Sequence, residues 1–248
     1  MSTGDPLLEV RGLIRQIGTQ RVLDGVDLRL HRGELLGLIG ANGSGKSTLI
    51  RCIAGLIDAD AGDIVIGGRP LRQDLLQARR QLGFAVDPAL LPDALTGQQC
   101  LEIFAAARGL GEVPSSTLAL AEELRLNGVL YAVVGRYSLG MRQKLSFCLA
   151  LLGEPPLLLL DESLNGLDPL GVYTAKQTLS NLVRQEKCAV VLATHMLDTT
   201  QACMTRVTLL HLGAILHEWR EAELRALRST DGVTLEQAMI ERLRGMDG

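Results

Sequence analysis

An eight-residue segment, Gly40-Ala-Asn-Gly-Ser-Gly-Lys-Ser47, constrains the fold of this chain more than any other feature. It matches GxxxxGK[ST] at every fixed position and lies between an apolar run, Leu35–Ile39, and a stretch with helical character. Glycines let the backbone curl so that successive N–H groups and the N-terminus of the next helix face a phosphate. A chance glycine-rich turn is the alternative, and the flanking strand and helix argue against it.

The pattern therefore predicts a nucleotide-binding phosphate loop. In such loops the lysine, here Lys46, neutralises charge at the β- and γ-phosphates, and the hydroxyl of Ser47 can hold Mg²⁺. Asn42 suits a glycine-like turn because asparagine tolerates left-handed backbone angles. The residues expected to bind the nucleotide here are Gly40, Asn42, Gly43, Ser44, Gly45, Lys46, Ser47 and Thr48.

Two adjacent carboxylates follow the four-leucine run at residues 157–160. A continuous apolar run of this length predicts a strand buried on both faces. Ligands of open α/β sheets bind at the carboxyl ends of such strands, where Asp161 and Glu162 are expected to lie. Asp161 is suited to hold Mg²⁺ through water and Glu162 to polarise the attacking water. Polar residues that merely end a strand are the alternative, but the phosphate loop favours the metal and water roles.

Composition narrows the class of protein. The 248 residues carry 25 Lys and Arg against 28 Asp and Glu, so no basic excess indicates a nucleic-acid partner. The hydrophobic content of 47% excludes a disordered chain. No apolar run approaches the roughly 20 residues of a membrane span, and no leader segment is visible at the N-terminus. The five cysteines form no CxxC pair, which favours reduced, packed thiols.

Hydrophobic periodicity predicts an α/β fold with a β-rich N-terminal portion. We expect strands at 7–10, 26–30, 35–39, 64–66, 157–160, 189–193, 207–212 and 214–217. Helices are expected from inside 45–50 to 54, over most of 71–152, at 176–185, at 221–228 and after 234. Thr96 and Gln99 have the spacing of a capping box, and Ser138 is a good N-cap for the helix that follows it.

Four further segments occur in a characteristic order. They are Phe84-Ala-Val-Asp87-Pro88, Tyr137-Ser-Leu-Gly-Met-Arg-Gln143, Ser163-Leu-Asn-Gly-Leu-Asp168-Pro169 and Thr194-His195. With them the chain resembles the ATP-binding subunits of ABC transporters, whose Q-loop region, signature motif, D-loop and switch histidine they match. The resemblance spans roughly residues 7–217. The Ser-Leu-Gly-Met signature and the tail at 234–243 resemble the drug- and peptide-exporting branch.

The resemblance implies a single ABC-type P-loop NTPase domain over 1–248. It implies an antiparallel β portion, a mostly parallel central sheet (1–70 and 153–217), an inserted helical subdomain (71–152) and a helical tail (218–248). Two copies, identical or different, would pair head to tail, with ATP between the phosphate loop of one and Ser138 and Gly140 of the other. Lys46, Glu162 and His195 would serve hydrolysis, and Asp168 would contact the partner.

Because ABC subunits of this kind act on a separate multi-span permease, the resemblance also implies a location at the cytoplasmic face of a membrane. The branch favours export of a drug, peptide, lipid or polysaccharide. The cofactors implied are ATP and Mg²⁺.

Three positions depart from the family pattern. Asp87 stands where the family usually has the Q-loop glutamine. Because a carboxylate is a good ligand for hard cations, we expect Asp87 still to contact the metal ion. Ile17 aligns with the aromatic residue that stacks on adenine, which predicts modest selectivity for ATP over GTP. Ser163 and Leu164 replace the usual Pro-Thr, and we expect chemistry to survive this change.

Other functional classes remain as alternatives. A soluble ABC-type ATPase acting on ribosomes or DNA usually has two cassettes or a long coiled-coil insertion, which this chain lacks. A non-hydrolysing sensor is disfavoured by the intact acidic pair, Asp161 and Glu162. A P-loop kinase or small GTPase is disfavoured by the signature motif and by the lack of an Asn-Lys-x-Asp guanine motif.

Overall fold

A six-stranded sheet forms the centre of the molecule. The computed structural model describes residues 5–229 and 234–244. The strand order is β10-β9-β3-β8-β7-β6, and every neighbouring pair is parallel except β9 with β10. The strands are β3 (Leu35–Ile39), β6 (Leu82–Phe84), β7 (Leu157–Asp161), β8 (Ala189–Ala193), β9 (Arg206–His211) and β10 (Ala214–Trp219). All residues of β3 and β8 are buried, as continuous apolar runs predict for strands covered on both faces.

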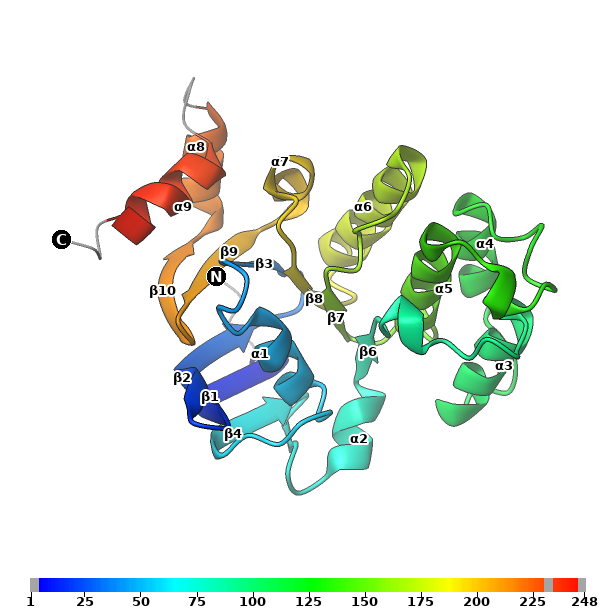
Figure 1. Ribbon diagram of the computed structural model, residues 1–248, viewed down its shortest axis with the longest axis horizontal. Helices are drawn as coiled ribbons and strands as arrows, with labels where there is room; N and C mark the ends of the chain where they lie inside the picture. Colours follow the sequence, from blue (N-terminus) through cyan, green and yellow to red (C-terminus); the bar gives the residue numbers. More distant parts are fainter. Residues whose placement is uncertain (1–4, 230–233, 245–248) are drawn as a thin grey trace.

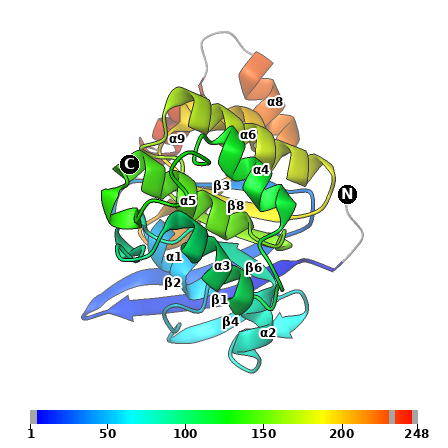
Figure 2. The same ribbon diagram turned by 90° about the vertical axis from the view of Figure 1, so that its right-hand side faces the viewer.

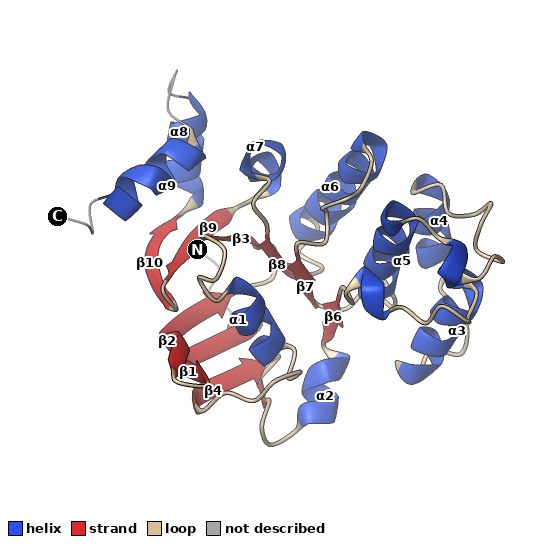
Figure 3. Cartoon of the chain, viewed as in Figure 1, coloured by secondary structure: helices blue, strands red, loops and turns tan. Residues whose placement is uncertain are grey.

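A second, antiparallel sheet lies on the other side of α1 (Lys46–Ile53), in the order β2-β1-β4-β5. Its strands are β1 (Leu8–Ile17), β2 (Gln20–Leu30), β4 (Ala61–Ile66) and β5 (Arg69–Pro70). β1 and β2 form a hairpin that is longer than the strands predicted at 7–10 and 26–30. Figures 1 and 3 show α1 between the two sheets. Leu49, Ile50 and Ile53 of α1 share one hydrophobic core with both sheets. The helix that follows the phosphate loop is thereby held from two sides.

Three helices gather at the right-hand end of the molecule in Figure 1, the end that faces the viewer in Figure 2. They are α3 (Gly97–Ala107), α4 (Ser115–Glu123) and α5 (Leu139–Leu151). The predicted capping box of α3 is confirmed, because Thr96 and Gln99 exchange side-chain and backbone hydrogen bonds. The predicted N-cap of α5 is confirmed too, since Ser138 Oγ accepts from the backbone N–H of Met141 at 3.2 Å.

Two elements differ from the sequence-based expectation. Leu82–Phe84, inside the stretch expected to be mostly helical, follow the short helix α2 (Leu75–Arg80) and form the edge strand β6 beside β7. Three residues are too few to produce a periodic signal. The helix α6 (Pro169–Arg184) begins before residue 176, because Asp168 accepts from the N–H of Gly171 and proline fits the first turn.

The remaining helices lie beyond the other face of the central sheet. They are α6, α7 (Leu197–Thr200), α8 (Glu221–Ser229) and α9 (Leu235–Arg244). They share a hydrophobic core with the helical group α3, α4 and α5. The α/β fold class with a mostly parallel central sheet is thus confirmed. Within the described ranges, no helix combines the length and the apolar character needed to cross a membrane.

The close approach of β6 to α5 leads to a stability prediction. A Cβ at Gly83 would lie 1.9 Å from the backbone carbonyl oxygen of Ala150 and 2.7 Å from Cγ of Pro155. We expect Gly83→Ala to lower the free energy of unfolding by about 1–3 kcal/mol, the usual cost of overpacking a core. Urea denaturation measures this change. Gly111→Ala is the control, because a Cβ there meets nothing within 4 Å, and an equal loss in both variants would contradict the explanation.

Candidate functional site

The phosphate loop runs from the end of β3 to the start of α1, and its course depends on two glycines. Gly40 has φ of 152°, and a Cβ there would lie 2.2 Å from the carbonyl oxygen of Leu210. Gly45 has φ of 109°, and a Cβ there would lie 2.7 Å from the carbonyl oxygen of Val22. No other residue type fits either position without moving a neighbouring strand. The loop is therefore pressed against β9 and β2.

Two other residues of the loop, Lys46 and Ser44, have polar groups that are available to a ligand. Lys46 is buried, and its Nζ donates to the carbonyl oxygens of Gly40 at 2.8 Å and Ala41 at 3.1 Å. No carboxylate in the described part of the chain forms an ion pair with it. Ser44 Oγ is buried and has no hydrogen-bond partner among the described residues. A positive charge and a free hydroxyl inside a curled loop are suited to hold an anion.

Ser47 of the phosphate loop meets Asp161 at the edge of the sheet where the parallel strands end. Ser47 Oγ donates to Asp161 Oδ1 at 3.0 Å, which joins the start of α1 to the end of β7. Burial raises the pKa of Asp161 above its ordinary value, against the opposing effect of the Ser47 hydrogen bond. A hydroxyl and a partly desolvated carboxylate side by side are hard oxygen ligands of the kind that a divalent cation takes.

Glu162 and His195 also meet, because β7 and β8 are neighbours in the sheet. Oε2 of Glu162 lies 3.1 Å from Nδ1 of His195. The backbone N–H of Glu162 donates to the carbonyl oxygen of Ala193 at 2.9 Å. Glu162 has a left-handed φ of 50°, which is uncommon for a residue with a side chain and concentrates at functional sites. The backbone is thus bent at the point where the carboxylate must leave the strand.

Asn165 belongs to the same group, although the sequence analysis did not identify it. Its Nδ2 donates to Glu162 Oε2 at 2.9 Å, and its buried Oδ1 has no partner among the described residues. The only signal in the sequence was its place in the segment Ser163–Asp168. Its amide fixes one oxygen of the Glu162 carboxylate.

A cavity of about 650 Å³ connects these groups and includes Asp87. Ser47, Asp161, Glu162 and Asn165 line it together with Asp87. Oδ1 of Asp87 accepts from the backbone N–H of Ala89 at 2.9 Å, so its carboxylate starts a short 3₁₀ turn. The structure therefore brings Asp87 to the cavity that holds the candidate metal ligands.

Of the predicted residues outside the phosphate loop, those that do not line this cavity are His195, Ser138, Gly140, Asp168 and Ile17. Ser138 is exposed and caps α5. Gly140 lies against Gly166, whose carbonyl oxygen would be 2.9 Å from a Cβ at residue 140. Asp168 caps α6 and accepts from Lys144 Nζ at 2.7 Å, which holds its pKa below the ordinary value. Ile17 pairs with Gln20 at the end of the β1–β2 hairpin and is 55% exposed.

Asn42, Gly43 and Thr48 were predicted only as residues that bind the nucleotide. Asn42 and Gly43 are exposed at the turn of the loop, and Gly43 has a left-handed φ of 80°. Thr48 lies in the first turn of α1 and is half-buried.

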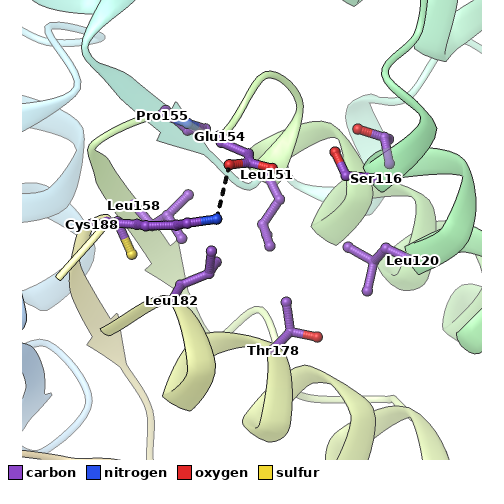
Figure 4. A pocket seen from close by; sticks show the side chains of 11 residues that line it. Ser116, Leu120, Leu151, Glu154, Pro155, Leu158, Thr178, Leu182 and Cys188 are labelled. Carbon is purple, nitrogen blue, oxygen red and sulfur yellow. Dashed lines mark ion pairs between the residues drawn. The ribbon is translucent and has the colours of Figure 1, made fainter. Parts of the chain in front are cut away.

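A separate, mainly apolar cavity of about 100 Å³ lies between α4, α5 and α6. Leu120, Leu158 and Leu182 point into it in Figure 4, and Lys187 and Glu154 form an ion pair of 3.6 Å beside it. None of the predicted site residues lines it. This apolar cavity is therefore separate from the group formed by Ser47, Asp161, Glu162 and His195.

Comparison with known proteins gives consistent matches. The ABC transporter family profile matches residues 23–165. An uncharacterized ABC transporter ATP-binding protein, YdbJ of Bacillus subtilis, is 36% identical over 243 residues, which cover 96% of this chain and 74% of that protein. The daunorubicin resistance ATP-binding protein DrrA3 of Streptomyces coeruleorubidus is 32% identical over 231 residues, covering 92% and 73%.

Solved structures agree with the fold. The ATP-binding subunit of an ABC transporter is 31% identical, with a TM-score of 0.83 over 96% of this chain and 99% of that one. The fold is also that of the ATP-binding cassette MJ0796, solved as a dimer in a post-hydrolysis state with ADP and Pi. That chain is 22% identical, with a TM-score of 0.77 over 86% of this chain and 98% of that one.

The raised pKa of Asp161 predicts a pH-dependent effect on stability. An acid whose pKa is raised by folding destabilises the fold when it is charged, and this cost disappears as the pH falls through the folded pKa. We expect Asp161→Asn to raise the melting temperature at about pH 7 and to have little effect at about pH 4, near the ordinary pKa of aspartate. Thermal denaturation at the two pH values measures this. A gain that is the same at both would show that desolvation of the charge is not its cause.

Proposed function

The chain belongs to the ABC transporter family as an ATP-binding subunit, and from this premise we propose that it hydrolyses ATP to drive a separate membrane permease. The observation that carries the proposal is the meeting of Ser47 with Asp161 and of Glu162 with His195 at one edge of the sheet. These pairs come from three distant segments, and together they supply an anion site, a cation site and a place for water.

We propose that the phosphate loop binds the triphosphate. The backbone N–H groups of residues 40–48 would face the phosphates, and the Ser44 hydroxyl would find the partner that it lacks in the protein. The ammonium of Lys46 would turn from the carbonyl oxygens of Gly40 and Ala41 to the β- and γ-phosphates. Ile17 would contact the base without stacking on it as an aromatic ring would.

Ser47 and Asp161 would hold Mg²⁺, with Asp87 near enough to join through water. Their oxygens fit the ion, which usually takes one or two carboxylates and the substrate's phosphates rather than an all-protein cage. When bound, Mg²⁺ neutralises charge on the β- and γ-phosphate oxygens. The Ser47 hydroxyl would then rotate its proton away from Asp161, which leaves both oxygens free to act as ligands.

Glu162 and His195 would act on the reacting water. Oε1 of Glu162, the oxygen not held by Asn165, is free to accept a proton from water as it attacks the γ-phosphorus. The bond from that phosphorus to the β-phosphate oxygen breaks, and ADP and inorganic phosphate leave. His195 would hold the γ-phosphate or the water in line. The left-handed backbone of Glu162 lets its side chain leave the strand toward the cavity that it lines with Ser47 and Asp161.

We propose that a second ATP-binding subunit completes each site. Ser138 is exposed at the N-terminus of α5, outside the cavity that the phosphate-loop side contributes. A hydroxyl, a glycine N–H and a helix N-terminus are suited to an anion, so Ser138 and Gly140 would face the γ-phosphate bound by the partner copy. Asp168, which caps the next helix, would lie at this contact. The dimeric MJ0796 cassette supports this arrangement.

The permease partner would be a multi-span membrane protein, which places this chain at the cytoplasmic face of the membrane. The printed name of the relative DrrA3 refers to daunorubicin resistance, and that of another, BcrA of Bacillus licheniformis, to bacitracin transport. Within the proposed export of a drug, peptide, lipid or polysaccharide, these names support a drug or a peptide. The substrate itself would be selected by the permease.

The catalytic assignment is tested with Glu162→Gln. We expect phosphate release to fall roughly hundredfold or more, the usual contribution of a positioned general base, while ATP binding is retained. A phosphate-release assay and a fluorescent-nucleotide binding assay measure the two quantities. Glu112→Gln, a change of the same kind at an exposed loop position, is the control. Full turnover in Glu162→Gln would remove Glu162 from the catalytic role.

The partner assignment is tested by capture. Tagged Glu162→Gln, trapped with ATP and Mg²⁺ in detergent-solubilised membranes of the source cell, should retain a stoichiometric multi-span protein. Mass spectrometry identifies what is retained, and a parallel capture without nucleotide is the control. Recovery of ribosomes or DNA instead would favour a soluble ATPase, and the transport assignment would be withdrawn.

A further inference from the structure

A small cavity links the C-terminal helix α9 to the candidate catalytic site. It measures about 190 Å³. Gly40 of the phosphate loop and Thr194 and His195 after β8 line one side, and Glu236 and Met239 of α9 line the other. Ile39 and Leu197 complete the lining. The C-terminal helix α9 is thus placed beside His195, which follows β8.

The position of α9 is well determined by its packing. Leu235 is 2% exposed and belongs to the same hydrophobic core as Leu197 and Trp219. Thr234 and Gln237 exchange hydrogen bonds of 2.9 Å and 3.1 Å between side chain and backbone, which fixes the first turn of the helix. Glu236 lies between Leu235, which is buried in the core, and Gln237, which forms hydrogen bonds with Thr234. Glu236 therefore lines the cavity from the capped first turn of the helix.

The imidazole of His195 shares its carboxylate partner, Glu162, with the amide of Asn165. In this structure its Nδ1 contacts Glu162 Oε2, the same oxygen that accepts from Asn165. Oε2 of Glu162 is thus shared by Asn165 and His195, while Oε1 is the oxygen left for the attacking water. Glu236 is the one other acidic residue that lines a cavity with His195 in the described part of the chain, and it forms no ion pair there. A carboxylate on one ring nitrogen orients an imidazole while the other nitrogen works.

We propose that Glu236 is a positioning residue that holds the imidazole of His195 when Glu162 turns to the attacking water. The inference rests on the proposed ATPase function and deepens it. The carboxylate of Glu236 accepts from the ring nitrogen that Glu162 releases, and the opposite nitrogen stays directed at the γ-phosphate. The C-terminal helix α9 is in this way a working part of the hydrolytic site, and its docking sets the rate of turnover.

The test compares Glu236→Gln with Glu241→Gln, the same change at an exposed position of the same helix outside the cavity. Each change is also made in the His195→Ala background, and steady-state hydrolysis of radiolabelled ATP is followed over a range of ATP concentrations. We expect Glu236→Gln to lower kcat roughly tenfold with little change in KM, the order expected for loss of a charge-assisted hydrogen bond. Glu241→Gln should behave as the wild type. In the His195→Ala background, Glu236→Gln should cause no further loss.

Three results would overturn the inference. They are full turnover in Glu236→Gln, an equal loss in Glu241→Gln, and an undiminished loss from Glu236→Gln when His195 is already absent. The second would mean that the charge of the tail matters only for its stability. If the wild-type protein releases no phosphate, the ATPase function itself fails, and the role of Glu236 falls with it. Wild-type turnover in the same assay therefore separates the two failures.

Discussion

Two backbone carbonyl oxygens, Leu210 O on β9 and Val22 O on β2, determine the course of the phosphate loop. A Cβ at Gly40 or Gly45 would collide with one or the other, so the loop can lie this close to the strands only as glycine. The contact joins the central sheet, the antiparallel sheet and the first turn of α1 at a single place. Lys46 and Ser47 take their positions from it, and the rest of the candidate site is arranged around those two residues.

Parallel strand order gathers the remaining groups. β3, β7 and β8 run in one direction as neighbours within the sheet, so the residues that follow them emerge at the same edge. Ser47 meets Asp161, and Glu162 meets His195, although more than a hundred residues separate the first pair in sequence. A short slip in register or a different strand order would separate these pairs without changing any local element.

The site keeps features that do not favour folding. Asp161 is charged in a place that disfavours charge, Glu162 has a left-handed backbone, and Lys46 has no carboxylate partner in the described chain. Such features are costly and persist where a ligand later compensates for them. In the proposed dimer, the exposed Ser138 and the distant phosphate loop would make the same point on a larger scale, because a second copy would complete each half of the site.

Structural features that depend only on neighbouring residues can be recognised in the amino-acid sequence alone. The phosphate loop, the buried strands, the capping box at Thr96 and the N-cap at Ser138 are local patterns of glycine, apolar runs and hydroxyls. The hydrogen bonds of the two caps close within three residues, and the apolar runs and the glycines of the loop can be recognised from neighbouring residues alone. The short strand β6 and the early start of α6 were missed because a three-residue edge strand has no period and Asp168 was interpreted as a partner contact.

Only the tertiary structure decided which distant residues meet. Strand order, the contact of Asn165 with Glu162, the entry of Asp87 into the main cavity and the docking of α9 beside His195 rest on packing between segments far apart in the chain. These contacts follow from burying shared apolar faces and from the register of parallel strands. Neither is encoded at any one place in the sequence, which is why the site could be listed from its motifs but assembled only in three dimensions.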